Sequence, residues 1–271
     1  MVLTKLQQNQ DNCIFLRRRN HRGREAHRRK HSQSKREEFL RDRREGGLFE
    51  ECPRACGGVA VMKIALINGS PKHKNSASGI LASLVKRLAK EKCECAEIKM
   101  NQPEPTAESV AVLRECDAWI IFYPLYVDGV PSHLLSCLKF LENCKETFDI
   151  KRIYAVSNCG FHDGRQCEWS LEVISHWSRH MGFDFCGGIG LGGGGAVPEV
   201  YATPVGEAIT SNYTKAMKKL IGKVLEQKSF ENFYASINLP RFIFKLAAER
   251  GWGRSLVKNG KKRSDIGHIP Q

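Results

Sequence analysis

One stretch of this sequence, residues 68–78, gathers residue types that bind anions. It reads Asn68-Gly-Ser-Pro-Lys-His-Lys-Asn-Ser-Ala-Ser78 and so combines glycine, hydroxyls and lysines. A nearly continuous apolar run, Lys63–Ile67, precedes it, and apolar residues at helical spacing, from Ile80 to Leu88, follow it. The stretch therefore joins a buried strand to an amphipathic helix. The first amides of such a helix carry partial positive charge and attract anions, phosphate above all.

From its own residues this loop has two interpretations. Its spacing matches neither the phosphate-binding P-loop nor the Gly-x-Gly-x-x-Gly turn of dinucleotide-binding proteins. It can be an anion site, or it can be an ordinary strand–helix connection in which Ser76 or Ser78 caps the helix. The choice depends on what the other strand ends carry.

Strands and helices alternate along the chain from Met62 onward. Apolar strands are predicted at Lys63–Ile67, Cys95–Met100, Ala118–Phe122, Arg152–Ser157 and Phe183–Gly190, with helical patterns between them and a long helix over Ile209–Lys228. This alternation predicts a parallel sheet with right-handed crossovers, hence a three-layer α/β domain with helices on both faces.

Three of the strand ends carry unusual loops. They are Gly69–Ser78, Pro124–Pro131 and Asn158–His162. Ligands of parallel α/β sheets bind beyond the carboxyl ends of the strands, so all three loops are expected at one edge of the sheet. This convergence favours the anion site over the plain cap.

Residues 1–61 have a different composition. They hold 15 Lys/Arg and 8 Asp/Glu, a net charge of +7, which is half of the chain's +14. With few large apolar residues to bury, this extension is predicted to be disordered. It is either a nucleic-acid-binding arm, the only route by which nucleic acid is expected to bind, or an extension upstream of a true start at Met62.

Cysteine usage and hydropathy limit the class of protein to which the chain can belong. The 11 cysteines are odd in number and lack framework spacing, which indicates reduced thiols in a cytoplasmic protein. None of their spacings suits a zinc or iron–sulfur site, so no metal is expected. No stretch approaches the roughly 20 apolar residues that span a bilayer, and no secretory signal precedes the domain.

The C-terminal region offers a second apolar cluster. It consists of Phe230, Phe233, Tyr234 and Ile237, and the helix-like run Phe242–Arg250 follows and precedes a basic end. This segment can pack back on its own domain, or it can embrace a second subunit and roof the site of the first.

The three loops together resemble the flavodoxin-like NAD(P)H-dependent FMN reductase family. The matching stretches are Ile67–Ser78, Phe122–Pro131 and Ser157–Phe161. The resemblance implies a five-stranded parallel sheet in the order 2-1-3-4-5, a domain over residues 62–228, a C-terminal helical extension over 229–271, and a homodimer. It does not cover residues 1–61.

The resemblance also implies which residues bind the cofactor FMN. The first loop would hold its phosphate, through Ser70, Lys72, Ser76, Ala77 and Ser78. The second would line the ribityl chain and one ring face, through Pro124, Leu125, Tyr126, Val127 and Asp128. The third would contact the pyrimidine edge, through Asn158, Cys159, Gly160 and Phe161.

Elementary chemistry agrees with this assignment. A flavin needs flat apolar walls, which Tyr126 and Phe161 can supply, and amides near its ring nitrogens, which residues 126–128 and 160 can supply. Tyr126 could instead be a half-buried surface aromatic. Cys159 is either a small buried filler or a reactive thiol, and the absence of a neighbouring base or cation in the sequence favours the filler.

The chain also departs from the family in two ways. Its first loop ends in Asn75-Ser-Ala-Ser78 instead of the Gly-Asn-Thr common in relatives, although hydroxyls are retained. True flavodoxins are usually acidic, whereas residues 62–271 carry a net charge of +7.

The implied function is an FMN-dependent oxidoreductase. It would transfer hydride from NAD(P)H through FMN to a small-molecule acceptor, which is a quinone, a nitro or azo compound, or a flavin. The alternative is a flavodoxin-like electron carrier without its own NAD(P)H oxidase activity. Because the hydride step needs no acid or base, no catalytic side chain is predicted.

Overall fold

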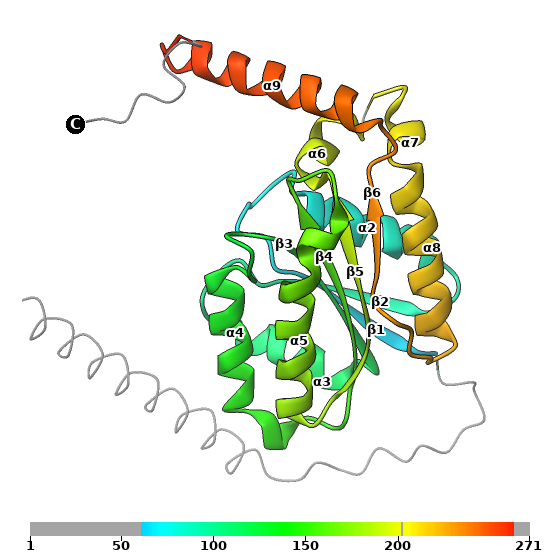
Figure 1. The fold of residues 1–271 in the computed structure, drawn as a ribbon. Coiled ribbons are helices and arrows are strands. Elements are labelled where there is room, and N and C mark those ends of the chain that lie inside the picture. Colours follow the sequence, from blue (N-terminus) through cyan, green and yellow to red (C-terminus); the bar gives the residue numbers. More distant parts are fainter. Residues whose placement is uncertain (1–60, 202, 263–271) are drawn as a thin grey trace, which may run out of the picture. The chain divides into compact units, whose positions relative to one another are not determined.

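The computed structural model describes residues 61–201 and 203–262. Its strands form one parallel sheet in the order β2-β1-β3-β4-β5-β6 (Figure 1). The strands are β1 (Lys63–Asn68), β2 (Glu94–Lys99), β3 (Ala118–Pro124), β4 (Arg152–Cys159), β5 (Asp184–Gly192) and β6 (Phe233–Ser236).

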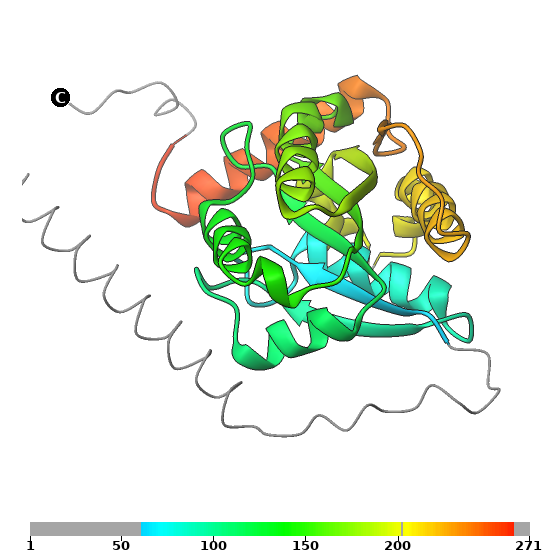
Figure 2. The same ribbon diagram turned by 90° about the horizontal axis from the view of Figure 1, so that it is seen from below.

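Helices cover both faces of the sheet, as Figure 2 shows from below. The helices are α2 (Ala77–Ala89), α3 (Ala107–Glu115), α4 (Ser132–Glu142), α5 (Glu168–Met181), α6 (Val197–Val200), α7 (Gly206–Ile209), α8 (Ser211–Leu225) and α9 (Arg241–Lys258). Short 3₁₀ turns lie at η1 (Lys145–Thr147), η2 (Gly164–Cys167) and η3 (Gly194–Ala196).

Alternation along β3 shows which helices share a face. Ile120 and Phe122 belong to the core cluster that includes α2 and α8. Trp119 and Tyr123 point the other way: the Trp119 indole donates to the carbonyl of Leu113 on α3 (3.1 Å), and the Tyr123 hydroxyl donates to that of Ser170 on α5 (3.0 Å). The three-layer α/β fold expected from the sequence is therefore confirmed.

The strand count differs from the prediction. The first five strands follow the order 2-1-3-4-5, but a sixth, β6, adds to the sheet beside β5. A helical extension was expected over residues 229–271, so no strand was predicted among the clustered apolar residues 230–237. Half-burial along all of β6 explains the missing alternation, since this edge strand packs on both faces.

Other boundaries moved by a few residues. β5 runs on to Gly192, two residues past its predicted end and the first residue of the glycine run. The helix predicted over Ile209–Lys228 is α8, which is shorter at both ends, and Ile209 ends the short helix α7 before it. α9 continues to Lys258, past the predicted end at Arg250.

Strand register determines what meets at the carboxyl edge. Asn68 pairs with Phe122, and Pro124 pairs with Asn158. On the other side of β4, Cys159 pairs with Gly192, which in turn pairs with Ser236. The loops that follow β1, β3, β4 and β5 therefore leave the sheet side by side.

The chain divides into two units between Val59 and Ala60, and every described residue lies in the second. The expectations for residues 1–61 fall outside the described residues, apart from Val61. Within the described ranges, no helix is long and apolar enough to cross a membrane, and no cluster of three or more metal-ligating side chains occurs.

Candidate functional site

Asn158, at the end of β4, ties the three predicted loops together. Its side-chain amide donates to the Ser78 hydroxyl oxygen (3.0 Å) and to the carbonyl of Tyr123 (3.0 Å). Its own carbonyl accepts from the amide of Leu125 (2.7 Å). Asn158 is only 5% exposed, so it connects the first, second and third loops from the buried side of the site. We call the surface formed by loops 69–78, 124–131, 158–162 and 192–196 the carboxyl-edge site.

The first loop is shaped by its own polar side chains. Ser76 is the N-cap of α2 and accepts from the amide of Gly79 (3.0 Å). The Ser70 hydroxyl oxygen accepts from the amide of Lys72 (3.3 Å), and its amide donates to the side-chain oxygen of Asn68 (3.1 Å). Asn68 was not among the predicted site residues, although it opens the predicted loop.

The donors left over in this loop fit a phosphate. The hydroxyl oxygens of Ser70, Ser76 and Ser78 all accept hydrogen bonds, so their hydrogens remain to be donated. The amides of residues 73–78 find no acceptor among the described residues. A buried helix start that has uncommitted amides and hydroxyls is the donor set that binds a phosphate group.

Electrostatics adds cations at the rim of this loop. Lys72 and Lys74 are exposed, and neither forms an ion pair with a described residue. His133, which the sequence analysis also missed, reaches the loop from the first turn of α4: its Nε2 lies 3.1 Å from the carbonyl oxygen of Gly69.

The second loop is a tight two-residue turn. Tyr126 and Gly129 exchange two backbone hydrogen bonds of 3.1 Å each, and Val127 and Asp128 between them have positive φ angles of 49° and 55°. A β-branched residue pays a steric cost in this conformation, yet the Val127 side chain is fully exposed. Strain of this kind is found at ligand-binding loops.

This turn changes which amides are available. The Tyr126 amide is committed to the carbonyl of Gly129, contrary to the expectation that it could face a flavin. The amides of Val127, Asp128 and Gly160 have no acceptor within the described ranges. These three remain as possible donors to a bound ring.

The third loop separates a buried thiol from exposed residues. The Cys159 thiol is buried, and it donates to the carbonyls of Phe161 (3.7 Å) and Asp163 (3.5 Å). Its hydrogen bond with Cys167, together with burial, raises the pKa of Cys159. Both observations favour the structural filler over a reactive thiol. By contrast, a Cβ on Gly160 would meet nothing within 4 Å, and Phe161 is 57% exposed.

A fourth loop, residues 192–196, was not assigned to the site from sequence. The amide of Gly193 donates to the carbonyl of Phe161 (2.5 Å). A Cβ on Gly194 would lie 2.7 Å from the side-chain oxygen of Asn158, so only glycine allows this approach. The glycine run Gly192–Gly195 is visible in the sequence, but the contact of this run with the third loop depends on strand order.

Eight of the 14 predicted residues form two groups. Hydrogen bonds bring Ser78, Leu125 and Asn158 together at the base of the site. Lys72, Tyr126, Val127, Asp128 and Phe161 have exposed side chains around it.

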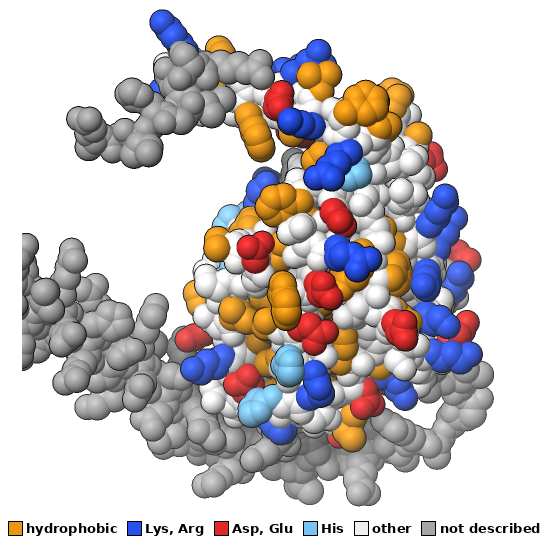
Figure 3. Space-filling model, in the orientation of Figure 1, with side chains coloured by type: hydrophobic (Ala, Val, Ile, Leu, Met, Phe, Trp, Pro, Cys, Tyr) orange, Lys and Arg blue, Asp and Glu red, His pale blue; other side chains and the backbone are white. Residues whose placement is uncertain are grey.

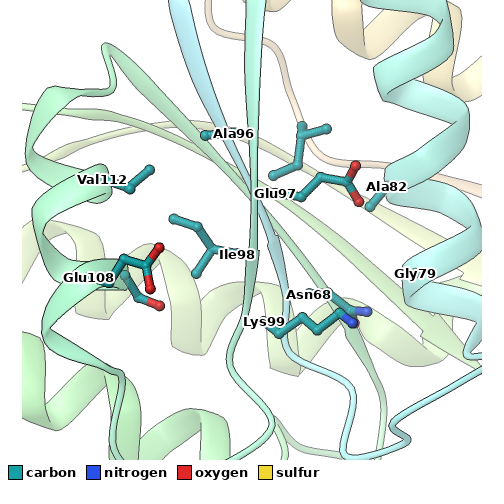
Figure 4. Close-up of a pocket in the computed structure, with 11 residues that line it drawn as sticks. Asn68, Gly79, Ala82, Ala96, Glu97, Ile98, Lys99, Glu108 and Val112 are labelled. Carbon is teal, nitrogen blue, oxygen red and sulfur yellow. The ribbon is translucent and has the colours of Figure 1, made fainter.

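A cavity of about 380 Å³ adjoins the first loop through Asn68 and Gly79, which flank it, but no residue of the four loops lines it. It straddles the edge strand β2: Ile98 faces Val112 of α3 on one side, and Glu97 and Lys99 face α2 on the other (Figure 4). It includes Asn68 but none of the 14 predicted site residues. Its charged walls offer no flat apolar surface for an aromatic ring, so the carboxyl-edge site remains the candidate.

Comparison with known proteins bears on this site. Residues 62–181 match the family model of NADPH-dependent FMN reductase. No curated protein sequence matches the chain.

The solved structures to which this chain is similar include the following three. The Trp repressor binding protein from Bacillus subtilis is 17% identical, with 58% of this chain and 96% of that chain covered and a TM-score of 0.43. The NAD(P)H:quinone oxidoreductase from Methanothermobacter marburgensis is 14% identical (61% and 100% covered, TM-score 0.42). An FMN-dependent NADH-azoreductase from Bacillus anthracis, in complex with FMN, is 14% identical (60% and 99% covered, TM-score 0.40).

The family match covers the first, second and third loops of the carboxyl-edge site, whose donor set fits a phosphate-bearing cofactor. Residues 62–181 therefore form a domain of the NADPH-dependent FMN reductase family, and the protein is an oxidoreductase that uses FMN and NAD(P)H.

Proposed function

We propose that the protein transfers hydride from NAD(P)H, through FMN held at the carboxyl-edge site, to a quinone, a nitro or azo compound, or a flavin. The observation that carries this proposal is the hydrogen bonding of Asn158, whose side chain and backbone carbonyl join the predicted phosphate loop to the two predicted ring loops. When bound, FMN supplies the hydride chemistry, and the protein supplies position and electrostatics.

The first loop anchors the phosphate end in this proposal. The hydroxyls of Ser70, Ser76 and Ser78 and the amide of Ala77 donate to the phosphate oxygens, and Lys72 adds charge from the rim. Because the loop is organised by its own hydrogen bonds before a ligand arrives, little ordering cost accompanies binding.

The other loops position the ring. Pro124, Leu125 and Tyr126 line one side, Asn158, Cys159 and Gly160 the other, and Cys159 contributes through its backbone because its thiol points inward. The free amides of Val127, Asp128 and Gly160 provide dipoles near ring nitrogens that gain electron density on reduction. Tyr126 and Phe161, which are 45% and 57% exposed, leave room for a second flat molecule to stack.

The proposal extends to the setting of the reaction. The catalytic unit spans residues 62–228, residues 229–271 form a C-terminal extension that begins with β6, and two copies associate. The eight cysteines that the structure describes are free thiols, which suits the reducing cytoplasm.

A visible spectrum of the purified full chain, before and after NADPH, tests this function. We expect flavin absorbance that NADPH bleaches under anaerobic conditions, and NADPH oxidation that a quinone accelerates. Flavin bleached only by a chemical reductant would instead establish the electron carrier. A chain that neither contains nor takes up FMN would contradict both.

A further inference from the structure

Helix α9 exposes large apolar side chains that no part of the described chain covers. None of its residues is buried, although it follows directly after β6 and so starts at the carboxyl edge of the sheet. Phe242 and Val257 are each 73% exposed, and Trp252 is 66% exposed. Ile243 and Leu246 are exposed as well. Figure 1 shows α9 projecting beyond the body of the domain.

The start of α9 is fixed in place beside the carboxyl-edge site. The Nε2 atom of His162, in the third loop, lies 2.8 Å from the carbonyl oxygen of Leu239. The His162 ring also packs edge-on against Phe244, with 5.4 Å between ring centroids. Phe244 faces the body, whereas Leu246, two positions on, lies on the far side of the helix. The exposed apolar side is therefore held away from its own domain.

A second apolar surface lies on α4 and α5. Leu135 of α4 and Trp169 and Val173 of α5 are exposed, and Trp169 reaches 73%. The two helices are joined by the Trp177 indole, which donates to the carbonyl of Leu138 (3.2 Å). We call the surface around Leu135, Trp169 and Val173 the α4–α5 face.

The charges of these two surfaces are complementary. α9 carries five basic residues, Arg241, Lys245, Arg250, Arg254 and Lys258, against one acidic residue, Glu249. Of the acidic residues, Glu168 and Glu172 lie on α5 next to Trp169 and Val173 in the chain, and Asp128 and Asp163 lie in the loops that precede α4 and η2. Figure 3 shows acidic side chains interspersed with hydrophobic ones on this side of the molecule. Two cations also lie on these elements: Arg165 stacks over the Tyr234 ring at 5.4 Å, and Lys139 is exposed one turn after Leu135 on α4.

We propose that two copies of this chain exchange α9, so that the helix of each docks on the α4–α5 face of the other. Each helix of 18 residues is about 27 Å long. Two such contacts suit an interface of standard size, roughly 1,200–2,000 Å². The docked helix adjoins the loops around Asp128 and Asp163, so each subunit borders the partner's carboxyl-edge site.

A membrane surface is the competing occupant, because α9 is basic and contains tryptophan. Helices that lie on membranes separate one apolar side from one charged side. On the exposed part of α9, Trp252 lies between Lys245 and Arg241 in helical projection, and Arg250 lies between Leu246 and Ile243. This mixed arrangement suits a protein partner of matching shape and charge better.

Sedimentation of the full chain over a dilution series tests the exchange. We expect a dimer whose dissociation constant rises about tenfold or more in Leu246→Asp and in Trp169→Asp, because each change removes an apolar anchor from one of the two surfaces. The matched control is Ile150→Asp, also at an exposed apolar position (73%) but at the opposite edge of the sheet, which should stay dimeric.

Mixing the two weakened variants separates exchange from other dimers. A pair of Leu246→Asp and Trp169→Asp chains retains one intact contact, α9 of the second on the α4–α5 face of the first, and should form heterodimers more tightly than either variant self-associates. A Trp169→Asp chain that dimerises normally would show that α9 pairs elsewhere and overturn the inference. So would a monomeric wild-type chain, including one that binds anionic phospholipid vesicles through α9.

The inference rests only on the dimer in the proposed function, not on its chemistry. The flavin spectrum of each variant distinguishes a failure of the helix exchange from a failure of the proposed function. A monomer that binds FMN and oxidises NADPH would overturn the exchange alone, whereas a dimer without flavin would overturn the function alone.

Discussion

Single residues at the first loop perform two tasks. Ser76 caps α2 through its oxygen and retains its hydroxyl hydrogen for a ligand, while Ser70 orders the turn before it. Asn158 then holds Ser78 from the third loop. The loop is thus part of the fold before it binds an anion, which means that stability and affinity must be measured separately.

The double variant Ser70→Ala/Ser76→Ala tests the effect of these hydroxyls on FMN affinity and on stability separately. Hydrogen bonds to a charged group contribute roughly 1.5–3 kcal/mol each, so we expect FMN affinity to fall by about 3 kcal/mol, or roughly 100-fold. Loss of the cap at Ser76 should also lower the free energy of unfolding by about 1 kcal/mol. Titration of FMN fluorescence and urea unfolding measure these effects.

Thr106→Ala is the matched control. Thr106 caps α3 in the same way, with the amide of Ser109 donating to its hydroxyl oxygen at 3.1 Å, but it lies outside the carboxyl-edge site. It should lose similar stability and leave FMN affinity unchanged. Equal FMN affinity in the wild type and the double variant would show that the phosphate binds elsewhere.

Among the elements, the glycine-rich loop after β5 has the most specific steric role. It approaches Asn158 so closely that any side chain at Gly194 displaces the amide that ties the site together. The register of β4 with β5, in which Cys159 pairs with Gly192, brings this loop to the third loop.

Gly194→Ala should therefore weaken both the fold and the site. Its Cβ would meet Asn158 at 2.7–3.1 Å, and overpacking of this kind costs about 1–3 kcal/mol of unfolding free energy. FMN affinity should fall at least about tenfold as Asn158 moves. Urea unfolding and FMN titration measure the two changes.

Gly222→Ala, in α8, provides the comparison for this loop. A Cβ there meets nothing within 4 Å, and alanine favours helix, so stability should rise by up to about 1 kcal/mol with FMN affinity unchanged. Unaltered stability and affinity in Gly194→Ala would mean that the loop is free to move away from Asn158.

For the whole molecule, buried thiols make stability depend on alkaline pH. Burial raises the pKa of Cys116 from 9.0 to about 11, and that of Cys95 and Cys137 from 9.0 to about 12. The folded state therefore holds protons that the unfolded state releases first. The contribution of these thiols to the free energy of unfolding is therefore fully present below pH 9, and it is lost as the pH rises from about 9 towards 12.

Urea unfolding in the presence of a reductant, at pH 7, 9 and 10.5, checks this dependence. The midpoint should change little from pH 7 to 9 as far as the thiols contribute, and then decline. Cys95→Ala removes one of the titrating groups and should make the decline shallower. An equal decline in that variant would assign the effect to other groups, such as the buried tyrosines.

Much of the fold was predictable because its signals are local. β1, β3 and β4 contain apolar runs that end in a turn or loop, β2 is a short edge-like strand, and the helices between the strands have apolar stripes. β6 was missed because an edge strand that is half-buried on both faces lacks alternation. The amide of Tyr126 was misjudged for a different reason: the turn that consumes it requires positive φ at Val127, which is rare for a β-branched residue.

The sequence by itself determined the alternating α/β architecture, the three strand-end loops and the chemistry that they offer, because these depend on residue type and on contacts between near neighbours. Only the tertiary structure decided that Asn158 joins those loops, that glycines 193 and 194 close on the third loop, and that α9 leaves the domain with its apolar side uncovered. These features depend on strand order and register, which bring together residues up to about 80 positions apart in the chain.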